Sequence, residues 1–288
     1  MPPDQGLLQP ARLDLPNLPP RLAGCRLAHL SDLHVRRPRS RRNPRSPRSN
    51  RLHERLLRQL GHAPPIDLLL LTGDYTNHPG DEPATLDLLR QLLDRLQPRL
   101  GAFGVFGNHD TPDFRQQART LPVHWLANDT VALPGHDLEI WGLDTNPADG
   151  GADSLAMLAR RQSLPTPASA ATGDAPAHPP LRLLLAHSPS HLTVAADLHA
   201  DLLLAGHTHG GQCRLPHGQA LVNACDMPLH LVAGILRHRD TLAAISRGIG
   251  HTGRIPRVFC PPHVPIYTLH HGPLPGQFTQ GVDNVQPW

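Results

Sequence analysis

Short apolar runs alternate with amphipathic segments along most of this chain, and the spacing of the leucines distinguishes the two kinds of segment. The apolar runs predict strands at 26–32, 66–74, 101–110, 138–145, 181–189, 200–211 and 241–248. Leucines three and four positions apart predict helices at 52–63 and 82–100, and shorter helices are predicted at 152–162 and 191–200. Strands that alternate with helices in this way predict one α/β domain.

Two segments do not fit this alternation. Residues 36–51 are mostly Arg, Pro and Ser, and residues 163–180 are rich in Pro, Ala and small polar residues. Neither segment carries enough apolar surface to order itself, so we expect both to be surface insertions. The resulting organisation is an N-terminal extension at 1–20, a single domain at 21–270 that contains both insertions, and a C-terminal tail at 271–288.

The composition limits the class of protein without naming its function. A chain of 288 residues can bury a substantial core, and because only 3% of its residues are aromatic, aliphatic side chains must build that core. The formal net charge is +3, but eight arginines and no acidic residue lie within 36–51, so the rest of the chain is net negative. The basic balance therefore describes one segment and does not make the whole chain a nucleic-acid binder.

The cysteines and the first residues bear on the cell compartment. The four cysteines are scattered and none forms a C-x-x-C pair, which favours reduced thiols over a disulfide framework. The first twenty residues lack the apolar core of a signal peptide, and no apolar window approaches the length of a membrane span. We therefore expect a cytoplasmic protein without a transmembrane segment, with peripheral contact at the inner membrane face as an open alternative.

Five of the predicted strands end on residues that are able to bind metal ions. These residues are Asp32 with His34, Asp74, Asn108 with His109, His187, and His207 with His209. In α/β folds the carboxyl ends of neighbouring strands converge on one crevice, so these side chains can meet in space. Taken singly, each has a structural explanation, because the chain holds 21 histidines and Gly-Asp or Asn-His-Asp is common in turns and helix caps. Only the whole set indicates chemistry.

The types of ligand in this set restrict the metal. Carboxylate, amide oxygen and imidazole without thiolate suit Mn²⁺, Fe or Zn²⁺ better than a cysteine-rich structural zinc site. So many donors indicate two divalent ions, which in such sites lie ~4 Å apart and hold the attacking and leaving oxygens of a phosphoryl transfer. We expect Mn²⁺, with Fe, Zn²⁺ or Mg²⁺ as alternatives.

In order, the motifs are D-x-H, G-D, G-N-H-D, H-S-P and G-H-T-H, and this order resembles the calcineurin-like metallophosphoesterases. They lie at Asp32/His34, Gly73/Asp74, 107–110, His187 and 206–209, and the resemblance runs from about Arg21 to about Leu269. The stretches GHTHGGQ and SRGIGHTG are similar to a bacterial branch that contains broad phosphodiesterases and UDP-diacylglucosamine pyrophosphohydrolases. Where many relatives have Cys-Pro-Pro-Glu, this chain has His263 after the two prolines.

The resemblance implies a fold and a set of metal ligands. The fold would be a four-layer α/β/β/α sandwich. Asp32, His34 and His209 would hold one metal ion, Asn108, His187 and His207 would hold the other, and Asp74 would bridge both.

The resemblance also implies a mechanism. A metal-bridging hydroxide would attack phosphorus in line, so no covalent intermediate is needed. His109 would not be a ligand; it would donate a proton to the leaving-group oxygen or stabilise charge there. Asp110 would orient the His109 imidazole.

The reaction is better defined than the substrate. The leading hypothesis is a phosphoesterase that acts on phosphodiester or pyrophosphate bonds, with a nucleotide-linked lipid precursor such as UDP-diacylglucosamine as one substrate. The alternatives are a non-enzymatic interaction module with the same fold, and a nucleic-acid-binding phosphoesterase that uses residues 36–51 on phosphates without reading bases.

The arginine-rich segment from Arg36 to Arg51 is a separate question. Runs of like charge resist packing, so one interpretation is a solvated insertion without a partner. The others are contact with nucleic acid or with anionic lipid, and because the segment begins two residues after His34, it must leave from the rim of the metal site.

Overall fold

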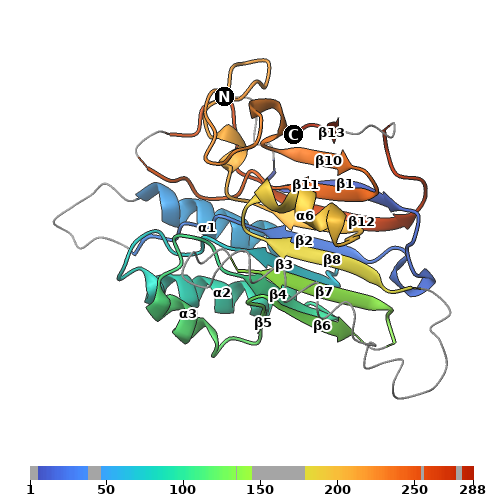
Figure 1. Cartoon of the computed structure of the whole chain (residues 1–288). Coiled ribbons are helices and arrows are strands. Elements are labelled where there is room, and N and C mark those ends of the chain that lie inside the picture. The colour runs from blue at the N-terminus through green and yellow to red at the C-terminus, as the bar shows by residue number, and fades with distance from the viewer. Residues whose placement is uncertain (1–5, 38–46, 134, 145–178, 254–255, 277–280) are drawn as a thin grey trace.

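Two β-sheets stacked face to face form the centre of the protein (Figure 1). The computed structural model describes residues 6–37, 47–133, 135–144, 179–253, 256–276 and 281–288. The six-stranded sheet has the order β1 (Leu8–Leu15), β12 (Val264–His271), β2 (Arg26–Leu30), β3 (Leu68–Thr72), β4 (Gly101–Val105) and β5 (His124–Trp125). The seven-stranded sheet has the order β13 (Val282–Gln286), β10 (Gly234–His238), β11 (Thr241–Ile245), β9 (Leu202–Ala205), β8 (Leu181–Ala186), β7 (Leu138–Leu143) and β6 (Asp129–Leu133).

Helices cover the outer face of each sheet. They are α1 (Pro47–Leu60), α2 (Glu82–Leu96) and α3 (Pro112–Ala118) on the six-stranded sheet, and α6 (Leu192–Asp197) on the seven-stranded sheet. Successive side chains of a strand point to opposite faces, so Leu70 of β3 and Leu185 of β8 lie in the core between the sheets, while Leu71 and Leu184 lie under the helices. This order of helix, sheet, sheet and helix confirms the predicted four-layer α/β/β/α sandwich.

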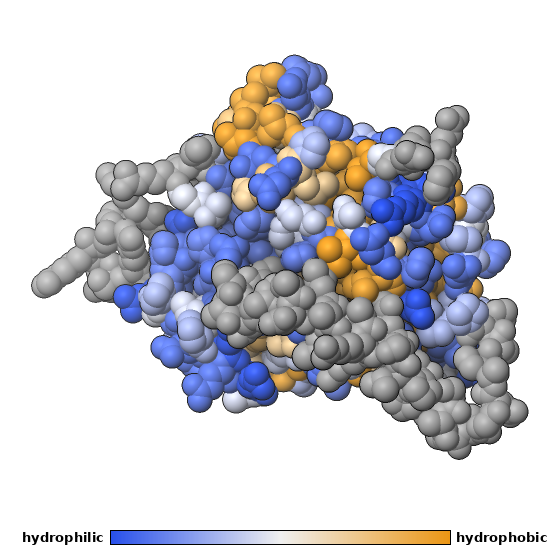
Figure 2. Space-filling model, in the orientation of Figure 1, coloured by the Kyte–Doolittle hydropathy of each residue, from blue (hydrophilic) through white to orange (hydrophobic). Residues whose placement is uncertain are grey.

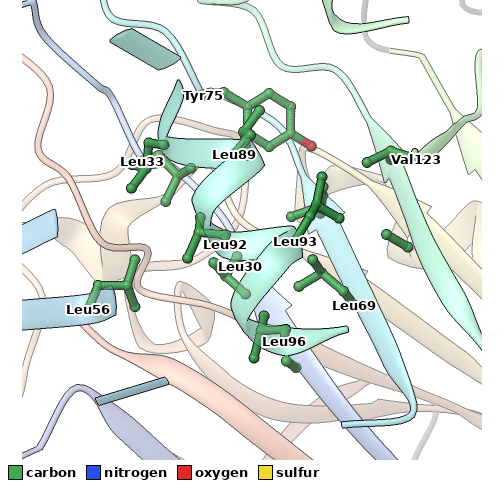
Figure 3. Close-up of a cluster of buried hydrophobic side chains, with 14 of the residues drawn as sticks. Leu30, Leu33, Leu56, Leu69, Tyr75, Leu89, Leu92, Leu93, Leu96 and Val123 are labelled. Carbon is green, nitrogen blue, oxygen red and sulfur yellow. The ribbon is translucent and has the colours of Figure 1, made fainter. Parts of the chain in front are cut away.

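The leucine spacing of α2 explains how this helix packs on the six-stranded sheet. Leu89, Leu92, Leu93 and Leu96 recur three and four positions apart and face the sheet, where they pack with residues such as Leu69 of β3 (Figure 3). The predicted helix at 82–100 ends at Leu96 because the backbone of Gln97 turns into the left-handed region, with φ of 40°. β4 begins four residues later.

The domain is larger at both ends than the sequence pattern indicates. Residues 8–15, expected in an N-terminal extension, form β1, which pairs in parallel with β12 and buries Leu13 and Leu15 between the sheets. Residues 282–286, expected in a tail, form β13 at the edge of the other sheet, antiparallel to β10. Both were missed because they depend on pairing with distant strands rather than on a continuous apolar run.

The structure describes part of the first predicted insertion and little of the second. Helix α1 begins at Pro47, so the end of the 36–51 segment belongs to that helix. Residues 163–178 and the helix predicted at 152–162 lie outside the described residues. Among the helices that the structure describes, none combines the length and apolar character needed to span a membrane.

Most neighbouring strands in the middle of each sheet run parallel. This holds for β2, β3 and β4 in one sheet, and for β7, β8, β9 and β11 in the other. The carboxyl ends of these strands therefore lie together at one edge of each sheet, and the loops that follow them can build a shared site.

Candidate metal centre

The predicted site residues converge at the carboxyl ends of five strands from both sheets. Asp32 and His34 follow β2, Asp74 follows β3, Asn108 and His109 follow β4, His187 follows β8, and His207 and His209 follow β9. Among the described residues, three sets of side chains each bring their ligand atoms within 4.8 Å of one another: Asp32, His34 and His209; His34, Asp74 and His109; and Asp74, His187 and His207. All the predicted His and Asp ligands belong to these sets, and so does His109. The predicted ligands themselves form two groups.

The first group consists of Asp32, His34 and His209, all of them buried. The Nε2 atoms of His34 and His209 lie 3.1 Å apart, and Asp32 Oδ1 lies 3.5 Å from His209 Nε2 and 4.0 Å from His34 Nε2. Two imidazole nitrogens and a carboxylate oxygen face one another, and this is a donor set that a divalent cation fits.

The second group consists of Asn108, His187 and His207. His187 Nε2 lies 3.1 Å from Asn108 Oδ1 and 3.0 Å from His207 Nδ1. Asp74 lies between the two groups, because its Oδ2 is 3.3 Å from His187 Nε2 and 3.5 Å from His34 Nε2. The other carboxylate oxygen of Asp74 accepts the backbone N–H of His109 at 2.8 Å, which fixes the carboxylate with Oδ2 toward the site.

Backbone carbonyls set the tautomers of two of these histidines. His187 Nδ1 lies 2.7 Å from the carbonyl oxygen of Thr72, and His207 Nε2 lies 3.1 Å from that of Ala224. A carbonyl oxygen only accepts, so these two nitrogens carry protons, and the opposite nitrogens are the ones that would present lone pairs to a bound cation. Orientation by a backbone carbonyl is typical of metal-binding histidine, so the residues present fit a cation pair.

The buried carboxylates favour positive charge at the centre. Burial alone lowers the pKa of His187, but the carboxylates of Asp74 and Asp32 outweigh it and raise that pKa to about 9. Burial likewise opposes ionisation of Asp74, yet His187 and His34 hold its pKa below the usual range. The same carboxylates would stabilise bound cations.

The backbone at this centre is strained. Five of the predicted ligands have positive φ, between 42° and 68°, and they are Asp32, His34, Asp74, His207 and His209. Residues other than glycine rarely adopt this conformation, and it persists only where surrounding contacts enforce it. Such strain is concentrated at functional sites, which agrees with the convergence of the side chains.

His109 lies close to the first group, because one of its ring nitrogens is within 4.8 Å of ligand atoms of His34 and Asp74. Its ring is perpendicular to that of His34, with centroids 4.9 Å apart, and it is partly exposed. Its Nδ1 lies 3.4 Å from the carbonyl oxygen of Asn77. The imidazole is thus near the centre and accessible to a bound molecule.

Asp110 does not orient the His109 imidazole as expected. Its buried carboxylate accepts the backbone N–H groups of Asp74 and Gly107 on Oδ2, at 2.9 and 2.8 Å, and those of Tyr75 and Thr76 on Oδ1, at 2.8 and 3.2 Å. Donors on both oxygens leave the carboxylate directed at the backbone. Asp110 therefore joins the loop after β3 to the loop after β4 and positions Asp74.

The segment after β11 supports the first group, a role that the motif alone did not reveal. Backbone N–H groups of Ile249 and Gly250 donate to the carbonyl oxygens of Ser31 and Asp32, at 3.2 and 2.7 Å. A Cβ on Gly248 would lie 2.6 Å from the Cβ of Asp32, and the φ of Gly248 is 68°, so a side chain has no place there. The glycines of SRGIG thus let this segment pack directly on a predicted ligand.

His263, the departure from the Cys-Pro-Pro-Glu pattern, lies behind this same segment. It is buried, its Nδ1 accepts the backbone N–H of Arg247 at 3.3 Å, and its ring packs edge-on against Trp288 with centroids 5.5 Å apart. Burial and the nearby Arg247 lower the pKa of His263 well below 6.5, so the ring is neutral. His263 therefore packs as an uncharged acceptor and holds the backbone at Arg247.

Comparisons with known proteins agree with the site. The family model "Calcineurin-like phosphoesterase" matches residues 25–211. The chain is 29% identical to the uncharacterized metallophosphoesterase YkoQ of Bacillus subtilis, over 84% of this chain and 83% of that protein. It is 30% identical to the phosphodiesterase YaeI of Escherichia coli, over 73% of each chain. It is 25% identical to the UDP-2,3-diacylglucosamine pyrophosphatase LpxG of Chlamydia muridarum, over 94% of this chain and 92% of that one.

An α/β/β/α sandwich with clustered His and Asp ligands at its strand ends defines a metal-dependent hydrolase of phosphoric esters. The chain belongs to the calcineurin-like phosphoesterase family. Its family and its relatives favour the enzyme over the non-enzymatic interaction module.

Proposed function

We propose that this centre hydrolyses phosphodiester or pyrophosphate bonds with two divalent cations. Asp32, His34 and His209 would hold one cation, Asn108, His187 and His207 would hold the other, and Asp74 would serve both. The position of Asp74 carries the proposal, because its Oδ2 lies 3.5 Å from a nitrogen of one group and 3.3 Å from a nitrogen of the other. When bound, the two cations lower the pKa of a water molecule and neutralise charge on the phosphoryl oxygens.

His109 is the proposed proton donor to the leaving-group oxygen. Its ring is partly exposed and adjoins His34, and it is not one of the ligands assigned to either cation, although a ring nitrogen lies within 4.8 Å of ligand atoms of His34 and Asp74. A group in this position can reach an ester oxygen that is held at the centre, and general acid catalysis of this kind contributes roughly 10²- to 10⁴-fold in rate.

The proposed metal is Mn²⁺, because the donor set of carboxylate, amide and imidazole contains no thiolate. The proposed substrate is a nucleotide-linked lipid precursor such as UDP-diacylglucosamine. It is supported by the similarity to a pyrophosphatase of that compound along nearly the whole chain. A nucleic acid is the alternative, to which the arginines of 36–51 would supply positive charge.

A panel of phosphate esters assayed with Mn²⁺ tests the proposal. The panel holds bis(p-nitrophenyl) phosphate, UDP-diacylglucosamine and single-stranded DNA, and each is measured with the wild type, His109→Ala and His62→Ala. His62 is an exposed histidine between α1 and β3, which makes it a matched control. We expect His109→Ala to lose roughly 10²-fold or more of turnover while it retains its metal, and His62→Ala to match the wild type. Full activity of His109→Ala on bis(p-nitrophenyl) phosphate would refute the role of His109.

A further inference from the structure

Exposed apolar side chains gather in two loops next to the metal centre. Among the described residues, the exposed large hydrophobic side chains are Leu221, Val222, Leu229, Val258 and Phe259, with exposures from 36% to 63%. All lie within 221–229 or 258–259, after β9 or before β12. Hydrophobic surface is visible where the loop between β9 and β10 protrudes from the sandwich (Figures 1 and 2).

Backbone pairing joins the two loops into one surface. Val258 pairs with Cys213, with hydrogen bonds from Val258 N to Gln212 O at 3.0 Å and from Arg214 N to Val258 O at 2.9 Å. On the other side of Cys213, the N–H of Leu221 donates to the Cys213 carbonyl at 3.0 Å. We call Leu221, Val222, Val258 and Phe259 the apolar rim.

The apolar rim adjoins the metal centre. The thiol of Cys260, next to Phe259 in the chain, donates to the carbonyl oxygen of His209 at 3.2 Å. Two residues after Val222, the carbonyl oxygen of Ala224 accepts from His207 at 3.1 Å. A surface that docked on the rim would therefore face the phosphoester site.

Phe259 is the most unusual member of the rim. It is 63% exposed and its φ is 48°, a conformation that bulky residues seldom adopt. The other phenylalanines that the structure describes, at 103, 106 and 114, are all buried. The fold thus holds an aromatic side chain out in solvent at a cost in backbone strain, which points to a partner that covers it.

The charge around the rim identifies that partner. In the described parts of segments 35–51, 212–232 and 250–260, the arginines with exposed or partly exposed side chains are Arg36, Arg37, Arg51 and Arg257, and the single acidic residue is Asp226. Arg36 contacts the loop between β11 and β12, with its Nη2 3.5 Å from the carbonyl oxygen of His251. Apolar side chains that protrude among arginines with almost no acids fit a bilayer that carries anionic headgroups.

We propose that the apolar rim inserts into the surface of an anionic lipid bilayer and presents the metal centre to it. The proposal deepens the proposed function, on which it rests for the reaction: the phosphoester substrate would be one that is embedded in the bilayer by its acyl chains. Phe259 and Val222 would enter the interface, and the arginines would contact lipid phosphates.

Vesicle sedimentation tests the docking independently of the chemistry. The full chain is pelleted with vesicles of equal parts phosphatidylcholine and phosphatidylglycerol, and with vesicles of phosphatidylcholine alone. We expect binding to the anionic vesicles, a partition coefficient roughly tenfold lower for Phe259→Ser, and near wild-type binding for Phe259→Trp, which keeps an aromatic ring at the same strained position. The thermal unfolding midpoint of each variant shows that it is folded.

Several results would overturn the docking proposal. They are absence of wild-type binding to anionic vesicles, equal pelleting of Phe259→Ser and the wild type, or equal binding to both kinds of vesicle. Binding to single-stranded DNA without binding to vesicles would assign the basic surface to nucleic acid instead. Hydrolysis of bis(p-nitrophenyl) phosphate by the wild type is measured in parallel, and its absence would count against the proposed function whatever the vesicles show.

Discussion

Asp110→Asn tests how the loops of the metal centre are held. The carboxylate of Asp110 accepts two backbone N–H groups on each oxygen, and the amide of Asn can present only one oxygen. In either orientation, two buried N–H groups then face an NH₂ group. Burial and the nearby Asp74 raise the pKa of Asp110 to about 7, so the comparison is made at pH 8, where the carboxylate is charged. Hydrogen bonds to a charged group contribute about 1.5–3 kcal/mol each, so losing two costs about 3–6 kcal/mol. This is a large part of the stability of about 5–15 kcal/mol that is common for a folded domain.

Urea unfolding and metal titration measure the two consequences. We expect the free energy of unfolding of Asp110→Asn to fall by about 3–6 kcal/mol, and its affinity for Mn²⁺ to fall because Asp74 is no longer positioned. Asp113→Asn is the control, since Asp113 is an exposed acid at the start of α3 and its replacement should change stability by less than about 1 kcal/mol. If Asp110→Asn unfolded like the control and kept its metal affinity while only turnover fell, the carboxylate would act on His109 after all.

Two further predictions concern buried groups near the centre. Burial lowers the pKa of His29 from 6.5 to about 3, so the unfolded chain binds a proton below pH 6.5 that the folded protein excludes, and stability present above pH 6.5 is lost as the pH falls toward 3. His29→Gln should therefore flatten the pH dependence of urea unfolding between pH 6.5 and 4, and parallel curves for variant and wild type would contradict this. A Cβ on Gly206 would collide with Ser31 and with the Asp32 carboxylate. Gly206→Ala should therefore lose Mn²⁺ in equilibrium dialysis, whereas Gly6→Ala, whose Cβ makes only ordinary contacts, should not.

The sequence predicted the convergence of the proposed ligands because each lies just after an apolar run. A buried strand such as β3 ends where its polar residues begin, so the position of Asp74 follows from the hydrophobic pattern. Parallel strands then bring these ends together without further information. The direction in which a side chain points does not follow from this pattern. Asp110 comes directly after His109 in sequence, yet its carboxylate faces the backbone of Asp74.

Two of the missed strands, β1 and β13, depend on partners that are far away in the chain. β1 contains Pro10, Arg12 and Asp14 among its leucines, and only pairing with β12 makes it a strand. β13 is largely polar and is held at the edge of its sheet by β10. In the same way, no local pattern around Phe259 indicates that its side chain stays exposed beside the metal centre, because that exposure is set by pairing between two loops.

Metal content tests the central claim most directly. The wild type and Asp74→Asn are purified in the presence of Mn²⁺, and metal per chain is measured by inductively coupled plasma mass spectrometry, with Asp87→Asn as the control because Asp87 is an exposed acid on α2. A carboxylate that bridges two cations predicts two metal ions per chain in the wild type and the control, and loss of metal in Asp74→Asn. Two ions retained in Asp74→Asn, or a single ion in an active wild type, would contradict the two-metal centre.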